Sequence, residues 1–152
     1  MSVKLGIAPI AWSNDDMPEL GGDTPLEQCL SEASEAGFKG IESGGKFPKT
    51  SKELIPILNK YNLKLCSGWY GANLRKNTFE EEKSKIQNQL KLFQDCKAPC
   101  MVFAEVYGSI QGDPNINLSK PILCPNLRDF STLLENTPAT ISYLSSYLDE
   151  IL

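Results

Sequence analysis

Residues that could bind or transform a small molecule follow four short apolar runs. The runs and their continuations read "GIAPIAWSNDDMPELGG", "GIESGGKFP", "CSGWYGANL" and "VFAEVYGSIQG". Each begins with apolar residues and ends with glycine, aromatic, carboxylate or amide residues. If the runs are parallel strands, these residues gather at the carboxyl ends of the strands, where α/β proteins bind their ligands. The sequence therefore predicts one wall of a binding site.

Two glutamates are the main candidates for acid–base chemistry. Glu42 and Glu105 follow apolar residues at the ends of the second and fourth runs. A carboxylate at such a rim can bind the hydroxyls of a sugar or transfer a proton. The alternative is a structural acid that accepts hydrogen bonds from backbone amides or a lysine, because a partly buried carboxylate needs partners. Both interpretations remain open for each residue.

Aromatic and amide side chains accompany the two glutamates. Trp12 and Trp69 could stack on the C–H face of a polyol and exclude water, or pack between strands and loops. Packing is the favoured interpretation for Tyr70 and Tyr107. Gln111 offers both the donor and the acceptor that a polyol requires. We therefore place Trp12, Trp69 and Gln111 in the predicted substrate-binding set.

Lys46 completes that set, although its "SGGKFP" context is not a phosphate loop. A phosphate loop needs a longer glycine-framed spacing and Ser or Thr after the lysine, and here Phe47 follows. Lys46 could still reach substrate oxygens as a point charge, or be a solvated lysine. The acidic run "NDDMPE" could cover the site or be a solvated loop. Its spacing does not match a calcium loop.

The chain has no histidine. This absence excludes Ser-His and Cys-His nucleophile pairs and imidazole metal ligands within the chain. Cys96 and Cys100 lack the two-residue gap of zinc and thioredoxin motifs, so buried packing is the favoured interpretation. No metal ligand is predicted among the residues of this chain.

Composition and charge are typical of a soluble globular domain. The 152 residues carry a net charge of −4, which gives no reason to expect nucleic acid or an anionic membrane as a partner. No apolar stretch approaches the roughly 18 residues of a membrane span, and the N-terminus is interpreted as a first strand rather than a signal peptide. The five scattered cysteines indicate reduced thiols and a cytoplasmic location.

A repeated strand–helix pattern must position the candidate residues. Three Thr-x-x-Glu capping boxes, at residues 24–27, 50–53 and 78–81, each start a helix between two apolar runs. Gly37 and Asn62 are suited to end the first two helices. The predicted strands are residues 5–10, 39–42, 63–67 and 100–105, and two further helices are predicted over 127–135 and 139–152. Four parallel strands cannot close an eight-stranded barrel, so the first and fourth are expected to be edges.

Three segments carry a family resemblance. "KLGIAPIAWSNDDMPELGG", "GFKGIESGGKFP" and "SIQG" resemble the inosose dehydratases of myo-inositol catabolism, which belong to the xylose-isomerase-like sugar isomerase and epimerase barrels. The resemblance covers roughly residues 3–121. It implies a (β/α)8 TIM-barrel lyase that dehydrates a keto-inositol (2-keto-myo-inositol) with manganese or cobalt. It also implies that the metal ligands are acidic residues and a histidine on later strands, which this chain does not contain.

The expected protein is therefore a single domain over residues 1–152. Residues 1–121 resemble the N-terminal half of the barrel, and residues 122–152 form a divergent helical tail. We expect a truncated chain that is inactive alone, that binds no metal alone, and whose partner is a small polyol or keto-sugar. The alternatives are a sugar (phosphate) isomerase or epimerase of the same superfamily, or a non-catalytic half-barrel. Self-association through the open sheet edges is also expected.

Overall fold

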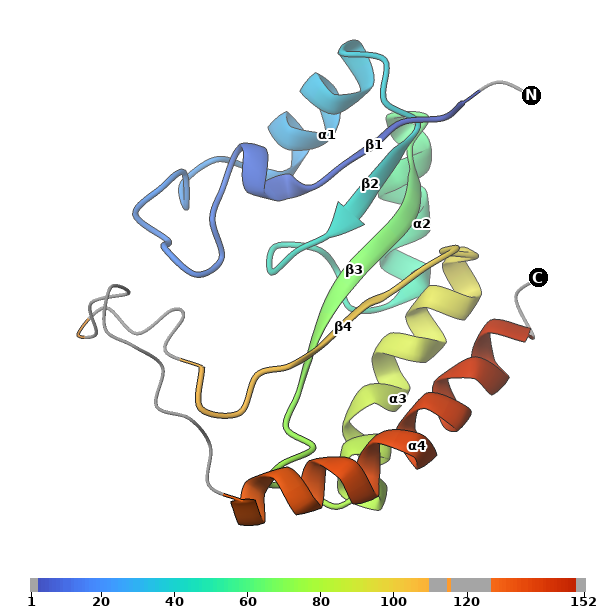
Figure 1. Ribbon diagram of the computed structural model, residues 1–152. Coiled ribbons are helices and arrows are strands. Elements are labelled where there is room, and N and C mark those ends of the chain that lie inside the picture. Colours follow the sequence, from blue (N-terminus) through green and yellow to red (C-terminus); the bar gives the residue numbers. More distant parts are fainter. Residues whose placement is uncertain (1–2, 110–114, 116–126, 150–152) are drawn as a thin grey trace.

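The computed structural model contains a sheet of four parallel strands that follow one another in chain order. The structure describes residues 3–109, 115 and 127–149. The strands are β1 (Gly6–Ile7), β2 (Gly40–Ser43), β3 (Lys64–Ala72) and β4 (Val102–Glu105). The sheet curls into half of an α/β barrel, with helices between the strands (Figure 1). The predicted fold class, an incomplete (β/α)8 barrel of about four units, is confirmed.

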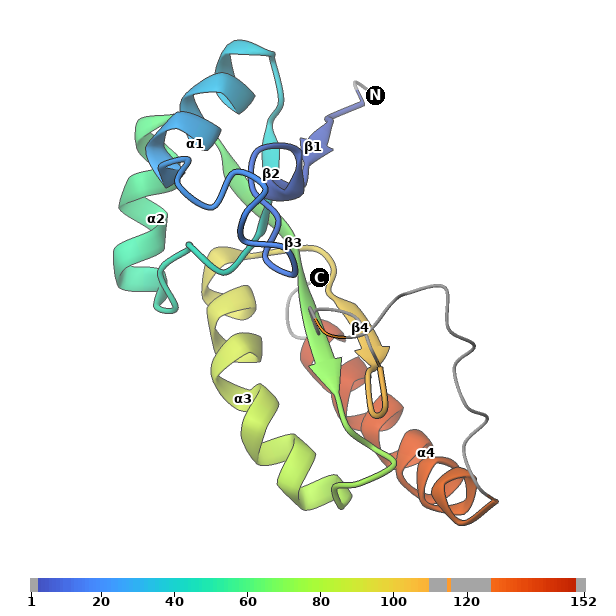
Figure 2. The same ribbon diagram turned by 90° about the vertical axis from the view of Figure 1, so that its left-hand side faces the viewer.

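The helices that connect the strands lie together on one side of the sheet. These are α1 (Leu26–Glu35), α2 (Ser51–Lys60) and α3 (Phe79–Cys96), and Figure 2 shows them along the same face. Leu54 and Leu58, one helical turn apart on α2, are buried in the core together with Ile41 of β2 and Leu65 of β3. Each such side chain stabilises the fold by about 1.5–3 kcal/mol through burial.

The three predicted capping boxes have different outcomes. Only the third forms: Thr78 accepts a hydrogen bond from the Glu81 backbone, and Glu81 accepts one from the Thr78 backbone. In the second, the Thr50 hydroxyl donates to the Glu53 carboxylate at 2.7 Å rather than capping the helix. The first is wrong, because Pro25 occupies the N-cap position of α1.

Three strands differ in length from the prediction, and β4 is shorter by two residues, since it begins at Val102 rather than at residue 100. β1 has two residues, because the 3₁₀ helix η1 (Pro9–Ala11) begins where the strand was expected to continue. β3 is longer than predicted and extends to Ala72. Its first half pairs with β2, and its second half pairs with β4 from Trp69↔Val102 to Ala72↔Glu105. Pairing with β4 therefore makes Trp69 a strand residue rather than a loop residue.

The C-terminal region forms one helix rather than the two predicted. Helix α4 (Leu127–Asp149) continues through Pro138, although an interior proline costs roughly 3 kcal/mol. Tertiary contacts compensate: the Asn136 amide donates to the carbonyls of Leu74 and Asn77 at 2.9 and 2.8 Å, and Tyr143 packs edge-on against Phe79 of α3.

Helix α4 therefore lies beside α3 and extends the helical layer, and none of the described helices covers the opposite face of the sheet (Figure 1). Large apolar side chains remain exposed on or beside the strands, namely Val3, Leu5, Ile10, Trp69 and Val102. Across the part of the chain that the structure describes, no helix is long and apolar enough to cross a membrane.

Candidate functional site

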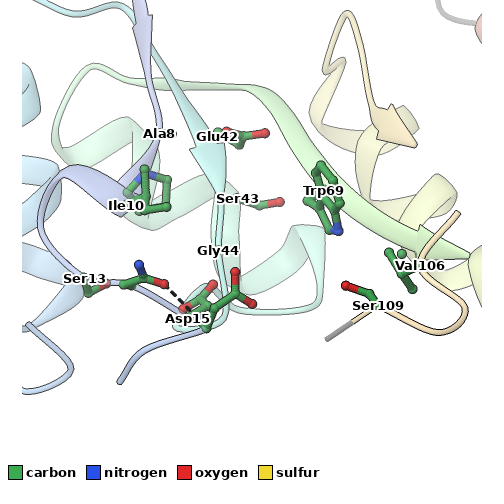
Figure 3. A pocket seen from close by; sticks show the side chains of 14 residues that line it. Ala8, Ile10, Ser13, Asp15, Glu42, Ser43, Gly44, Trp69, Val106 and Ser109 are labelled. Atoms are coloured by element: carbon green, nitrogen blue, oxygen red, sulfur yellow. Dashed lines mark hydrogen bonds between the residues drawn. The ribbon is translucent and has the colours of Figure 1, made fainter. Parts of the chain in front are cut away.

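A cavity of about 560 Å³ opens at the carboxyl ends of the strands. Its walls come from η1 and the loop after it, from β2 and the loop that follows, from β3, and from the segment after β4 (Figure 3). The polar and aromatic residues that line it include Asn14, Asp15, Asp16, Glu42, Trp69 and Ser109. The cavity lies where the sequence predicted a binding site.

Glu42 and Trp69 flank the cavity from neighbouring strands. Glu42 is half-buried near the end of β2, and its one hydrogen-bond donor among the described side chains is the Ser67 hydroxyl at 3.4 Å. This contact is long for a hydroxyl–carboxylate bond, so the carboxylate keeps acceptor capacity toward the cavity. The indole of Trp69 is 55% exposed. The structure thus brings together two of the six predicted substrate-binding residues.

The acidic loop after η1 forms another wall of the cavity. Asn14 Oδ1 accepts hydrogen bonds from the backbone N–H groups of Asp16 and Met17, at 2.9 and 3.1 Å. Asp15 Oδ2 accepts one from the Gly45 N–H at 2.7 Å, which ties this loop to the loop after β2. The predicted site set omitted Asp15 and Asp16. Their position just after the first apolar run was the signal that could have included them.

The glycines after β2 have a packing role. A Cβ built on Gly44 would lie 2.9 Å from Pro9 Cγ, and one on Gly45 would lie 2.9 Å from Asp15 Oδ1. Real Cβ atoms do not approach other atoms so closely, so an alanine at either position would require Pro9 or the Asp15 carboxylate to shift. The two glycines therefore allow the acidic loop to pack closely against the loop after β2.

Trp12 and Glu105 do not line the cavity and are engaged elsewhere. Trp12 packs against the core, and its Nε1 donates to Glu32 Oε2 at 2.6 Å. This hydrogen bond, with a second one from Gln28, lowers the pKa of Glu32. Glu105 accepts hydrogen bonds from the backbone N–H groups of Leu74 and Tyr107 at 2.6 and 2.9 Å. The hypothesis that five residues share one cavity is therefore wrong for Trp12 and Glu105. Glu105 is instead a structural acid that accepts hydrogen bonds from backbone amides, the alternative given for it above.

Lys46 also has a structural position. Its Nζ donates to the backbone carbonyls of Thr24 and Gly21, at 2.5 and 3.3 Å, which holds the loop before α1. It lines a separate small hollow rather than the main cavity. Gln111 lies outside the described residues, so its predicted role stays a prediction.

The two tyrosines at the rim are packed, as favoured. The Tyr70 hydroxyl donates to the buried carboxylate of Glu82 at 2.6 Å, and its ring stacks on Phe103. Burial, and then the Glu82 carboxylate, raise the pKa of Tyr70. Arg75 lies over the ring of Tyr107, 5.0 Å from its centroid.

The described residues do not fit the divalent metal that the family resemblance implies. Within the described ranges, no group of three or more Cys, Asp or Glu side chains could hold a metal ion. Asp15 accepts a hydrogen bond from the Gly45 N–H and Glu42 accepts one from the Ser67 hydroxyl, so no single point is shared by three carboxylate or thiolate ligands within the described residues. The Cys100 thiol donates to the carbonyl of Cys66, and burial raises the pKa of the Cys66 thiol, which makes it a poorer metal ligand.

Comparison with known proteins identifies relatives with similar sequences. The rhizopine catabolism protein MocC of Rhizobium meliloti is 49% identical over 105 residues, which are 69% of this chain and 32% of MocC. An inosose dehydratase of Mesomycoplasma hyopneumoniae is 45% identical over 111 residues, 73% of this chain and 37% of the relative. The chain is a homologue of the inosose dehydratases.

An inosose dehydratase of Geobacillus thermodenitrificans extends the match. It is 43% identical over 122 residues, which cover 79% of this chain and 41% of that enzyme. No family model matches the chain. The chain therefore spans about a third to two fifths of the length of these relatives. The resemblance to inosose dehydratases that the sequence motifs indicated is confirmed.

Proposed function

We propose that this chain forms the substrate-binding part of an inosose lyase, in which a keto-inositol occupies the cavity between β2, β3 and the acidic loop. The observation that carries the proposal is the pairing of the Glu42 carboxylate with the exposed Trp69 indole at the carboxyl ends of parallel strands. Carboxylates can accept hydrogen bonds from adjacent hydroxyls, and an indole can cover the apolar face of a ring. The identity with named inosose dehydratases supports the same assignment.

Dehydration beside a ketone requires three events. The carbonyl oxygen is polarised, a proton leaves the adjacent carbon, and the departing hydroxyl is protonated. Glu42 is suited to the second event or to binding hydroxyls, because its carboxylate faces the cavity with one long hydrogen bond. Asp15 is oriented by the Gly45 N–H, which leaves it able to bind substrate hydroxyls. Trp69 would exclude water from one side of the ring.

The first event is not assigned to any residue of this chain. A metal usually polarises the carbonyl in such a reaction, and the described residues do not fit one. We therefore propose that the chain alone binds polyols or keto-sugars without turning them over. The alternatives are a half-barrel that has no part in an inosose lyase, and a sugar isomerase or epimerase of the same superfamily. A cytoplasmic location stays a prediction.

Ligand binding and turnover are tested separately. Saturation-transfer NMR should detect binding of myo-inositol to the chain. Glu42→Gln should weaken this binding by about tenfold or more, because a hydrogen bond to a charged group contributes about 1.5–3 kcal/mol. The matched control is Glu80→Gln, an exposed glutamate on α3 outside the cavity, which should leave binding unchanged. Equal binding by both variants would contradict the role of Glu42.

Turnover is measured as consumption of keto-inositol by the purified chain, and metal binding by calorimetry with manganese. We expect no turnover and no tight manganese binding, because a catalytic metal site usually needs three or more protein ligands. Measurable turnover, or micromolar manganese affinity, would show that the chain assembles a complete site.

A further inference from the structure

A second groove adjoins the main cavity and shares Trp69 with it. It has a volume of about 440 Å³ and lies between the loop after β2 and helix α3. Lys49 and Pro48 contribute from the loop, and Lys85, Asn88 and Gln89 contribute from α3. We call it the lysine groove. It shares Asp15 and Trp69 with the main cavity, but the proposed dehydration uses none of its lysine or amide side chains.

The charge of the lysine groove is opposite to that of the main cavity. The charged residues of the main cavity are Asp15, Asp16 and Glu42, and no lysine or arginine is among its described lining residues. The lysine groove has Lys49 and Lys85, with Asp15 at the boundary between the two. Asp15 already accepts the Gly45 N–H. The charged residues that line the groove thus sum to a net charge of +1 in a chain of net charge −4, and Glu81, one turn before Lys85 on α3, interacts with Lys85.

The polar side chains of the lysine groove have N–H groups that can donate hydrogen bonds to a ligand. Lys49 Nζ makes one long hydrogen bond, 3.3 Å to the carbonyl of Gly44, which leaves further N–H groups of the ammonium for a ligand. Lys85 and Asn88 lie one turn apart on α3 and therefore share a face of the helix. The Gln89 amide donates to the carbonyl of Trp69 at 2.9 Å, which holds the helix against the strand that carries the indole.

We propose that the lysine groove binds the phosphate group of a small phosphorylated polyol, whose carbon skeleton lies against Trp69. Two ammonium groups and an amide match a dianion with several acceptor oxygens, and lysine binds phosphate as a point charge. The indole supplies the apolar surface for the carbon skeleton. This site goes beyond the proposed function, because a keto-inositol carries no charge for the lysines to bind.

The test reads the fluorescence of Trp69. The chain has two tryptophans, so Trp12→Phe leaves Trp69 as the sole reporter. Glucose 6-phosphate, inorganic phosphate and glucose are titrated separately into this variant. We expect glucose 6-phosphate to change the emission at lower concentration than either of the other two. Calorimetry on the unmodified chain gives the same comparison without depending on Trp12→Phe.

Substitutions then locate the ligand. Lys49→Gln and Lys85→Gln should each raise the dissociation constant for glucose 6-phosphate about two- to fivefold, and the double variant about tenfold, as expected for exposed ion pairs. Lys64→Gln is the matched control, because Lys64 is an exposed lysine at the opposite end of β3. It should stay within about twofold of the parent. The affinity should fall as salt is added.

Each other outcome overturns the proposal. If inorganic phosphate binds as tightly as the ester, Trp69 does not hold a carbon skeleton. If glucose binds as tightly as the ester, the lysines do not recognise phosphate. If Glu42→Gln weakens phosphate-ester binding while the lysine variants do not, the ligand occupies the main cavity instead. No response at millimolar glucose 6-phosphate in either measurement excludes the site.

Discussion

Glu82 is a buried acid on α3 that contacts the strand carrying Trp69, so its removal tests what holds this wall of the cavity in place. It is 2% exposed, and its two carboxylate oxygens accept the Tyr70 hydroxyl at 2.6 Å and the Asn77 amide at 2.7 Å. These contacts join α3 to β3 beside Trp69 and to the turn before the helix. Glu82 therefore holds the second half of β3, which carries one wall of the cavity.

Glu82→Ala removes both hydrogen bonds and leaves two donors without their acceptor. A hydrogen bond to a charged group contributes about 1.5–3 kcal/mol to stability. Loss of both bonds should therefore lower the free energy of unfolding by about 3–6 kcal/mol. Partial access of water to Tyr70 and Asn77, which are only half-buried, favours the lower end of that range. Because small domains are stable by only about 5–15 kcal/mol, this variant should be close to unfolding.

The assay is urea unfolding followed by circular dichroism at neutral pH. Glu80→Ala is the matched control, since Glu80 is exposed in the same first turn of α3. This substitution should lower the free energy of unfolding by at most about 1 kcal/mol, because it removes a favourable interaction with the helix dipole. Tyr70→Phe, which removes one hydroxyl, should fall between the two variants. If Glu82→Ala and Glu80→Ala unfold within about 1 kcal/mol of each other, the buried contacts do not carry the stability assigned to them.

Three further outcomes are expected. Gly68→Ala should lower the free energy of unfolding by about 1–3 kcal/mol, because its Cβ would lie 2.6 Å from Phe93 Cζ; an unchanged urea midpoint would contradict this packing. In a Trp69→Phe variant, Trp12 emission should titrate with a midpoint below 4.5, the ordinary pKa of Glu32, since Trp12 lowers that pKa. The Trp12–Glu32 hydrogen bond is present above the ordinary pKa of Glu32 and is lost as the pH falls through the lowered pKa. A midpoint at or above 4.5 would therefore refute the stabilisation of the Glu32 carboxylate by Trp12. Finally, we propose that the chain associates with a second copy through its open sheet edges; sedimentation velocity should show concentration-dependent species, and a monodisperse monomer would oppose this.

The sequence alone determined the order and type of most elements. Apolar periodicity, Gly37 and Asn62 are local signals, and both residues do adopt positive φ at the helix ends. Parallel pairing in chain order followed from the alternation of strands and helices. The carboxyl end of a parallel strand lies at the ligand-binding edge, so the sequence also indicated the position of Glu42 at the cavity. It did not indicate where the side chain points, since Glu105 ends β4 in the same way and binds backbone N–H groups instead.

Only the tertiary structure decided what the other candidates contact. Glu105 turns to the N–H of Leu74, which is 31 positions away, and Trp12 turns to Glu32, which is 20 positions away. Side-chain type states what a residue can bind but not which of several partners lies within reach. The extension of β3 and the continuity of α4 through Pro138 were likewise decided by distant contacts, with β4 and with the turn before α3. Local propensity is worth about 1 kcal/mol or less at most positions, so a few such contacts outweigh it.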